Sequence, residues 1–256
     1  MNVAPPLPFT MSEDEVSNSL RMLLWGPPGA GKTWLAASAV DVEEMSPVAF
    51  INLDRGTKTI RTRQGISVFT LPTSHSADGW EELKKLTDWL LTKDHGFKTV
   101  IFDSLDGLHT LIQKILIKVD SLKKPERDMD VATELDWYRG MNRFTSVLDL
   151  YKQYATFNFI CTCSSQLKTD AQTTLKFYKF ALPVGLAEPT AGAFDLVAFM
   201  KAEYDGKVTK RIFQTVETSK VTVAKDRNII NKPMLENPTM QDIWSEMKEV
   251  ERQRTT

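Results

Sequence analysis

Short apolar runs alternate with longer segments of helical periodicity over the first two thirds of the chain. Trp80, Leu83, Leu86 and Leu90, for example, recur at the three- and four-residue spacing of an amphipathic helix. Such alternation predicts an α/β fold with a mostly parallel sheet flanked by helices on both faces. We expect strands at 19–25, 47–54, 66–71, 98–104 and 157–163, and helices within 32–45, 79–93, 105–119 and 134–154.

The pattern changes near Leu167. Residues 167–192 show no clear periodicity and are expected to form a long loop. Beyond them, two strand-like runs flank Asp205-Gly206, which predicts an antiparallel hairpin near the C-terminus. We expect one more strand at 220–225 and a closing helix that begins near Thr239. Residues 1–18, rich in proline and then acidic, are expected to be a flexible N-terminal arm, and 19–256 a single domain.

Composition narrows the functional classes. A net charge of −1 and a pI near 6.3 exclude a generally basic nucleic-acid binder, although they allow a local basic groove. Cys161 and Cys163 lie two residues apart in an apolar run, so we expect both to be reduced core thiols. The N-terminus lacks the pattern of a secretory signal, and no apolar run has the length of a membrane span, so a cytoplasmic location is expected.

The stretch from Gly26 to Thr33 matches the phosphate-loop pattern G-x-x-x-x-G-K-[ST] between a predicted strand and a predicted helix. Its backbone N–H groups are expected to face the phosphates of ATP, with Lys32 reaching the β- and γ-phosphates and Thr33 ligating Mg²⁺. The nucleotide contacts we expect are Gly26, Pro27, Pro28, Gly29, Ala30, Gly31, Lys32, Thr33 and Trp34.

A carboxylate at the end of a second buried strand should complete the magnesium site, and Asp103 ends the run VIFD. Ser104 follows it, where many AAA+ ATPases place a catalytic glutamate, so the acid that orients the attacking water must come from elsewhere. Asp54 is the best candidate, on a strand expected beside the phosphate loop. Asp106 is an alternative, and Asp54 could equally cap its own turn.

Several short motifs resemble the RecA-like ATPases, in the core-only form found among phage single-strand annealing and recombination proteins. They are FINLD, TVIFDSLDGL, FICTCSSQ, VAKDRN and NPTMQDIWSEM. The resemblance implies a sensor at Gln166 and a Lys-x-Arg element, Lys225 and Arg227, that enters a neighbouring subunit's ATP site. It therefore implies a ring or filament with ATP at subunit interfaces. The catalytic set it implies is Lys32, Asp54, Asp103, Gln166, Lys225 and Arg227.

The same resemblance implies single-stranded DNA binding by the segments after the Walker B helix and after the sensor strand, 123–130 and 167–192. In the second, lysines alternate with aromatic residues, a pattern that can follow phosphates and stack on bases. The DNA contacts expected there are Lys168, Lys176, Phe177, Tyr178 and Lys179, although packing into the core explains the aromatic residues about equally well. A single-strand DNA-binding protein is a further expected partner.

Three other functions remain open from the sequence. A helicase loader or other replication accessory ATPase would use the same core. A small-molecule kinase would bind ATP as a monomer and ignore DNA. A nucleotide-gated scaffold would barely hydrolyse ATP, which is compatible with an aspartate at position 54, one methylene shorter than the glutamate common in RecA.

Overall fold

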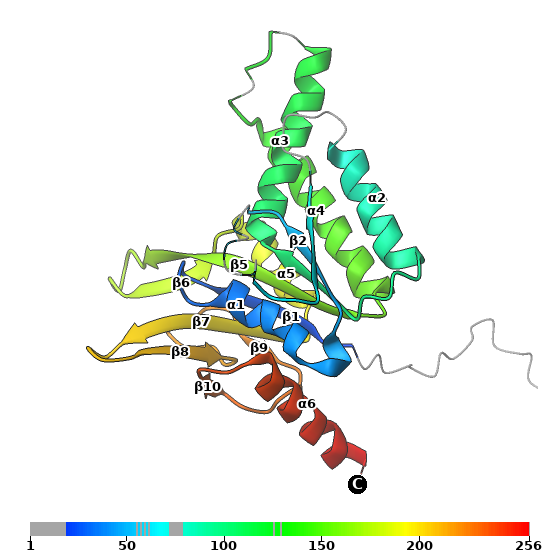
Figure 1. The fold of residues 1–256 in the computed structure, drawn as a ribbon. Coiled ribbons are helices and arrows are strands. Elements are labelled where there is room, and N and C mark those ends of the chain that lie inside the picture. The colour runs from blue at the N-terminus through cyan, green and yellow to red at the C-terminus, as the bar shows by residue number, and fades with distance from the viewer. Residues whose placement is uncertain are drawn as a thin grey trace, which may run out of the picture.

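The computed structural model describes residues 19–54, 56, 58, 60, 62–71, 79–124, 126–128 and 130–255. The arm predicted over 1–18 lies outside the described residues. Within them, one extended sheet runs through the molecule with helices on both sides (Figure 1).

The sheet has the order β10-β8-β7-β1-β5-β4-β2-β3. Six neighbouring strands from β7 to β3 are parallel, and β8 and β10 extend the β7 edge in antiparallel fashion. A short strand, β9, pairs with β7, and β6 pairs with β5. Their bounds are β1 (Arg21–Gly26), β2 (Val48–Asn52), β3 (Ile66–Thr70), β4 (Thr99–Asp103), β5 (Asn158–Thr169), β6 (Lys176–Phe180), β7 (Leu196–Tyr204), β8 (Thr209–Gln214), β9 (Lys225–Asp226) and β10 (Met234–Glu236).

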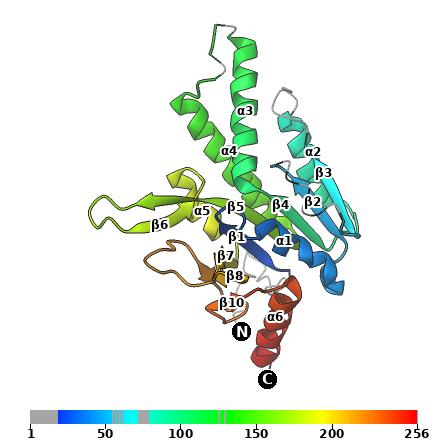
Figure 2. The same ribbon diagram turned by 60° about the vertical axis from the view of Figure 1, so that its left-hand side comes forward.

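Helices cover the two faces of this sheet (Figure 2). One face packs against α2 (Gly79–Thr92), α3 (Leu105–Lys123), α4 (Glu134–Tyr154) and α5 (Ala187–Gly192), and the other against α1 (Lys32–Ala37), η1 (Ser38–Asp41), η2 (Glu43–Met45) and α6 (Met240–Thr255). Successive residues of a buried strand serve opposite faces. Ile101 of β4 thus joins the α1–α6 core, whereas Phe102 joins the α2–α5 core with Tyr151 and Phe159.

The predicted architecture is confirmed: an α/β fold with a mostly parallel central sheet flanked by helices, and a C-terminal antiparallel hairpin, β7–β8. The closing helix also begins as expected. Thr239 Oγ1 accepts a hydrogen bond from Asp242 N at 3.2 Å, and Asp242 Oδ2 accepts one from Thr239 N at 2.7 Å, so the first turn is capped reciprocally. No helix in the described ranges is long and apolar enough to cross a membrane.

Three element predictions are corrected. Residues 167–192 are not a long loop: β5 continues to Thr169 and returns as β6, and α5 follows. Most residues of this extension are exposed or half-buried, so its sequence lacks the continuous apolar run of a buried strand. The strand expected at 220–225 is reduced to the two residues of β9. The first helix ends at Ala37, where the Ser38 hydroxyl donates to Leu35 O and the chain tightens into 3₁₀ turns.

Candidate nucleotide-binding site

The phosphate loop leaves β1 at the carboxyl-terminal edge of the parallel strands, the edge at which ligands bind in open α/β sheets. Gly29 and Gly31 have φ values of 77° and 95°, a region that side chains with a Cβ rarely adopt. Because α1 starts at Lys32, its first N–H groups have no intrahelical acceptor and point out of the helix end. The predicted loop therefore has the backbone conformation that a phosphate cradle requires.

Lys32 is held inside this loop. Its Nζ donates to Gly26 O at 2.8 Å and to Pro27 O at 3.0 Å. Burial lowers the pKa of Lys32, against the opposing influence of nearby carboxylates, chiefly Asp103. An ammonium group that is partly desolvated and bonded to neutral carbonyls interacts strongly with a phosphate that replaces them.

Asp103 lies at the end of β4, with both oxygens engaged by hydroxyl groups. Thr33 Oγ1 donates to its Oδ2 at 3.0 Å, and Thr162 Oγ1 donates to its Oδ1. Burial raises the pKa of Asp103, and these two hydrogen bonds and Lys32 act to lower it. The structure thus brings together the two predicted magnesium ligands, Thr33 and Asp103.

This donor set suits Mg²⁺. Hydroxyl and carboxylate oxygens are hard ligands, and Mg²⁺ in nucleotide sites takes one or two protein groups, with waters and phosphate oxygens completing its octahedron. Consistently, the described residues contain no cluster of three or more histidine, cysteine or acidic side chains of the kind that would hold a metal without a nucleotide.

Asp54 follows the expected strand, β2, but that strand has a different place in the sheet than predicted. Its strand is not beside the phosphate loop: β2 neighbours β4, and β4 and β5 separate it from β1. The Asp54 N–H instead bonds to Asp103 O at 3.2 Å, and its carboxylate accepts from the Ser104 side chain. Burial, with the nearby Asp106 and Asp103, raises the pKa of Asp54, whereas Lys32 acts to lower it.

Asp106, the alternative acid, is already engaged in the fold. Its Oδ1 accepts a hydrogen bond from Ser164 N at 2.8 Å, which ties the start of α3 to β5. Ser104 caps the same helix by accepting from Gly107 N at 3.1 Å. Both acids are therefore bonded within the site, Asp106 to a backbone N–H of β5 and Asp54 to the Ser104 side chain.

Two polar residues of this site, Thr162 and Ser164, were missed by sequence reasoning. They recur at spacing two along β5, on the face opposite the buried Cys161 and Cys163. Polar residues at alternate positions of an otherwise apolar strand were the available signal. Both thiols are free and buried, and burial raises their pKa values well above the ordinary one, as expected of reduced core cysteines.

A small cavity of about 300 Å³ lies at the phosphate loop, lined by Gly29, Gly31, Lys32, Thr33, Trp34 and Arg211. Trp34 is 39% exposed, and the Arg63 guanidinium lies over its ring at 5.2 Å from the centroid. Arg211 comes from β8, more than 170 residues along the chain, and nothing in the sequence marks it. The cavity therefore combines predicted loop residues with one cation that sequence reasoning missed.

Gln166 and the expected DNA contacts lie on the β5–β6 hairpin. Gln166 is exposed and pairs with Lys179, and Lys168 pairs with Phe177. Directly opposite residues share a face, so these four side chains lie on one face of the hairpin. Tyr178 lies on the other face, where it packs against Phe199 at a ring distance of 5.0 Å. Lys176 shares that second face near the tip, where it is exposed. The five expected DNA contacts are thus divided between two faces.

Lys225 and Arg227 lie near the amino-terminal ends of β1 and β7, whereas the phosphate loop follows the carboxyl-terminal end of β1. Arg227 N donates to Asp195 O at 3.0 Å, and Asp195 lies beside Arg21 at the start of β1. Gly26, the first residue of the phosphate loop, is five residues further along β1, so it lies about 16 Å from Arg21. Arg227 also pairs with Asp195 Oδ1 at 3.1 Å, and Lys225 Nζ donates to Ala191 O at 2.7 Å. Neither side chain reaches the phosphate loop of its own chain.

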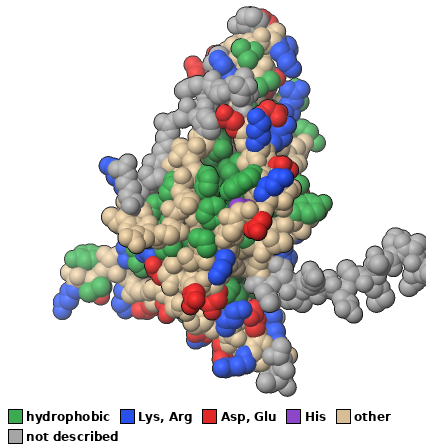
Figure 3. Space-filling model, turned by 45° about the vertical axis from the view of Figure 1, so that its right-hand side comes forward, with side chains coloured by type: hydrophobic (Ala, Val, Ile, Leu, Met, Phe, Trp, Pro, Cys, Tyr) green, Lys and Arg blue, Asp and Glu red, His purple; other side chains and the backbone are tan. Residues whose placement is uncertain are grey.

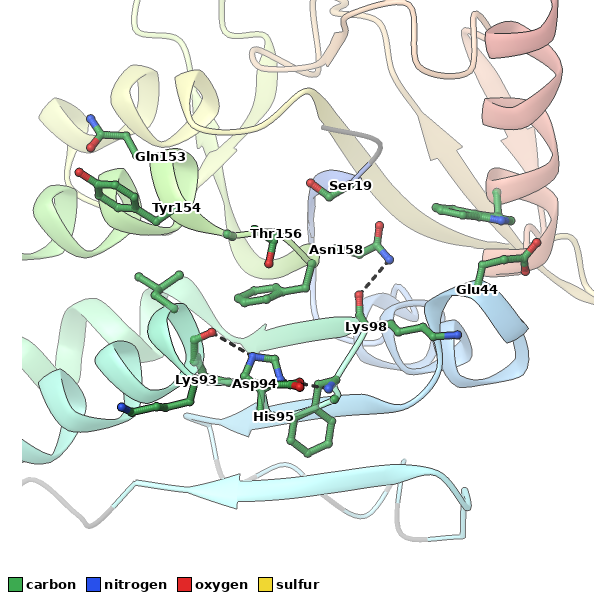
Figure 4. Close-up of a pocket in the computed structure, with 17 residues that line it drawn as sticks. Ser19, Glu44, Lys93, Asp94, His95, Lys98, Gln153, Tyr154, Thr156 and Asn158 are labelled. Carbon is green, nitrogen blue, oxygen red and sulfur yellow. Dashed lines mark hydrogen bonds between the residues drawn. The ribbon is translucent and has the colours of Figure 1, made fainter. Parts of the chain in front are cut away.

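Two larger hollows lie elsewhere and lack the chemistry of a phosphate site. One, of about 1060 Å³, opens beside the ends of α2 and α4 (Figure 4). Its inner polar groups bond one another: His95 Nε2 contacts Leu90 O at 2.9 Å, and Asn158 Nδ2 donates to Lys98 O at 3.0 Å. The other, of about 570 Å³, is a mainly apolar groove between α2 and α4. Figure 3 shows hydrophobic side chains gathered on the helical side of the molecule.

Comparison with known proteins bears on this site. The family described as AAA domain matches residues 18–228, which span the phosphate loop, Asp54, Asp103 and the Lys-x-Arg element. No curated protein matches the chain.

Among solved structures, a KaiC-like protein from Pyrococcus horikoshii is 13% identical, with a TM-score of 0.43, and the alignment covers 85% of this chain and 88% of that one. The flagellar accessory protein FlaH from Methanocaldococcus jannaschii is 12% identical, with a TM-score of 0.41 and coverage of 89% and 92%. The family match extends over most of the chain and includes its complete phosphate site, so the chain belongs to the AAA domain family of P-loop ATPases.

Proposed function

We propose that this chain hydrolyses Mg²⁺-ATP at the interface between two subunits, binds single-stranded DNA, and promotes strand annealing in phage-type recombination. The observation that carries the ATPase part is the convergence of Lys32, Thr33, Asp103 and Asp54 on one edge of the sheet. Two cysteines buried as free thiols fit a reducing cytoplasm, where such a reaction takes place.

The side chains divide the work of hydrolysis. Lys32 and the loop N–H groups bind the phosphates, and Thr33 and Asp103 hold the Mg²⁺ that neutralises charge on them. Asp54 orients the attacking water and accepts its proton. Partial burial, with the nearby Asp106 and Asp103, raises the pKa of Asp54, so its carboxylate is a stronger base than that of an aspartate in water, which suits proton transfer near neutral pH. The shorter reach of aspartate leads us to expect slow turnover.

Arg227 and Lys225 are proposed to act on the nucleotide of a neighbouring subunit. Their distance from the phosphate loop of the same chain leaves them no role there, whereas an arginine supplied in trans can stabilise charge on the γ-phosphate. Arg21, Lys225 and Arg227 surround the single carboxylate of Asp195, so this edge keeps an excess of positive charge. This positive charge would attract the phosphates of the nucleotide bound to the next subunit in a ring or filament.

DNA binding is proposed for the hairpin face that carries Gln166, Lys168, Phe177 and Lys179. Two lysines can follow phosphates, and the half-buried Phe177 can stack on a base without sequence preference. The face continues the side of β5 that holds Thr162 and Ser164 at the nucleotide site. Two lysines per subunit bind weakly, so repetition along an assembly is needed for useful affinity.

The primary test measures ATP turnover and particle size with and without single-stranded DNA, followed by annealing of complementary strands. We expect DNA-stimulated turnover by a large assembly, and annealing that requires ATP. Lys32→Ala and Arg227→Ala should each abolish turnover, and an equal mixture of the two variants should restore part of it, because each supplies what the other lacks across one interface.

The DNA face is tested separately by fluorescence anisotropy with a labelled oligonucleotide. Lys168→Ala combined with Lys179→Ala should weaken binding, and should also flatten its salt dependence because two phosphate contacts are lost. Lys85→Ala with Lys93→Ala removes the same charge from exposed positions on and after α2 and should leave binding unchanged. Equal losses in the two double variants would contradict the assignment. Turnover by a monomer that ignores DNA would instead favour a small-molecule kinase.

A further inference from the structure

Arg211 lies directly against the phosphate loop. A Cβ built on Gly31 would meet its Cδ and its Nε, each at 2.8 Å, so the guanidinium end of the side chain reaches the loop from β8. The two residues line the same small cavity as Lys32 and Trp34. Arg211 is thus a second basic side chain at a site where Lys32 is the only cation predicted from the same subunit.

The fold fixes the backbone from which Arg211 extends. Its N–H donates to Asn237 Oδ1 at 2.8 Å, and its carbonyl accepts from Asn237 N at 2.7 Å. On the other side, Arg211 pairs with Ala202 in the β7–β8 ladder. Phe213, two residues along, lies in the α1–α6 core, so alternation places Arg211 on the same face as the loop. The backbone from which this side chain extends is thus held in position without the help of a ligand.

Within the described part of the chain, no carboxylate forms an ion pair with Arg211. Its Nε is buried and finds no hydrogen-bond partner among the residues that the structure describes. The ion pair next to it on β8 joins Lys210 and Glu236 instead. Leaving a buried donor of a charged group unsatisfied is costly, and an anion that accepts from it relieves the cost. The cavity is lined by phosphate-loop residues that include Lys32, and such a loop is suited to binding phosphate.

We propose that Arg211 binds the phosphate chain of the nucleotide within the same subunit, as the partner of Lys32. This rests on the proposed ATP binding and adds to it a recognition residue in cis, distinct from the Lys225–Arg227 element that acts in trans. The guanidinium fork can donate hydrogen bonds to two phosphate oxygens at once, which a lysine cannot match. Nucleotides with two or more phosphates are therefore the ligands that Arg211 favours.

The experiment measures binding of fluorescent ADP and ATP analogues to the full chain, with unlabelled tripolyphosphate and adenosine as competitors. Arg211→Ala should weaken ADP and ATP binding about 10- to 100-fold, the usual range for a lost charge-assisted contact. In this variant, tripolyphosphate should displace the fluorescent nucleotide less well, and the nucleotide affinity should depend less steeply on salt concentration. The nucleotide affinity of Arg211→Lys should lie between those of the wild type and Arg211→Ala, because the positive charge remains and the guanidinium fork is lost. Lys210→Ala is the matched control on the same strand.

The outcomes separate this inference from the proposed function. If the wild-type chain binds no nucleotide, the proposed function fails and the inference with it. If the wild type binds in a Lys32-dependent way while Arg211→Ala and Arg211→Lys stay within twofold of it, the proposed function stands and the inference is overturned. A loss of adenosine binding with unchanged tripolyphosphate competition also overturns it, since Arg211 would then contact the base. Melting temperatures measured without nucleotide detect a variant that has simply lost stability.

Discussion

Gly107 is predicted to be essential for turnover although it touches neither nucleotide nor metal. It lies in the first turn of α3, where a Cβ would come within 2.2 Å of Asp54 Oδ1 and 3.3 Å of Asp54 Cγ. Ordinary Cβ contacts of this kind are not closer than 3.0 Å, so Gly107→Ala forces the Asp54 carboxylate to move by about 0.8 Å or more. The glycine is therefore what allows the proposed water-orienting acid to approach the helix.

Gly107→Ala should change the stability of the protein little and lower its activity strongly. Alanine inside a helix is favoured over glycine by about 1 kcal/mol, which offsets the cost of moving the Asp54 carboxylate aside. The free energy of unfolding should thus stay within about 1 kcal/mol of the wild-type value. A misplacement of about 1 Å in a catalytic group, by contrast, costs about 100-fold in rate. We expect Gly107→Ala to lose 10- to 100-fold in single-turnover hydrolysis while nucleotide affinity changes little.

The assay pairs single-turnover ATP hydrolysis with nucleotide titration and urea unfolding, for Gly107→Ala, Asp54→Asn and the control Gly192→Ala. Gly192 closes α5, and a Cβ there meets nothing within 4 Å, so the control adds the same methyl group without a clash. Wild-type turnover in Gly107→Ala together with lost turnover in Asp54→Asn would refute the claim that the position of Asp54 is constrained by Gly107. Undiminished turnover in Asp54→Asn would remove Asp54 from the mechanism altogether.

Three further predictions concern other parts of the molecule. Thr162→Val removes the hydroxyl that bonds to the buried Asp103, so Mg²⁺-dependent nucleotide binding should weaken about tenfold, measured by titration at several Mg²⁺ concentrations. Burial lowers the pKa of Lys225 to about 8, so its ammonium is charged below that pH and neutral above it. Nucleotide-dependent assembly, followed by light scattering, should therefore weaken as pH rises through 8 in the wild type and persist in Lys225→Arg. Phe180 packs edge-on against Trp25 at 4.7 Å, so Phe180→Ala should lower the free energy of unfolding by about 3–5 kcal/mol in urea titrations, as a core residue does.

The parts of the site that could be predicted are those encoded by local sequence. The phosphate loop is a contiguous segment whose glycines and lysine act through their own backbone, so its conformation follows from a few neighbouring residues. Asp103 was predictable because a carboxylate that ends a fully buried strand must emerge at the edge of the sheet. The same reasoning identified β1, β4 and the buried half of β5 as apolar runs, and from them the fold class.

What could not be predicted depends on which strands become neighbours. Strand order is decided by crossover connections and packing, so local sequence does not predict that β4 and β5 separate β2 from β1. Asp54 still reaches the site beside β4. Arg211 arrives from β8, whose position beside the loop is fixed by pairing with β7 and by Asn237. The sequence pattern predicts a loop in place of the β5–β6 hairpin because only the inner face of the hairpin is apolar, and Tyr178 and Phe180 supply that face from a mixed sequence.

The titration of the site explains why its charges need a nucleotide. The pKa values of Asp54 and Asp103 are raised, mainly by burial, and that of Lys32 is lowered for the same reason. A carboxyl group whose pKa is higher in the folded chain than in the unfolded one makes the folded state less stable as pH rises from the unfolded pKa to the folded one. At neutral pH the protein therefore carries ionised carboxylates at a cost to stability. In the proposed complex, a magnesium ion would face the carboxylates and the phosphates would face Lys32 and Arg211. Both parts of this cost would then be removed together, so the complete Mg²⁺-nucleotide should bind more tightly than either component alone.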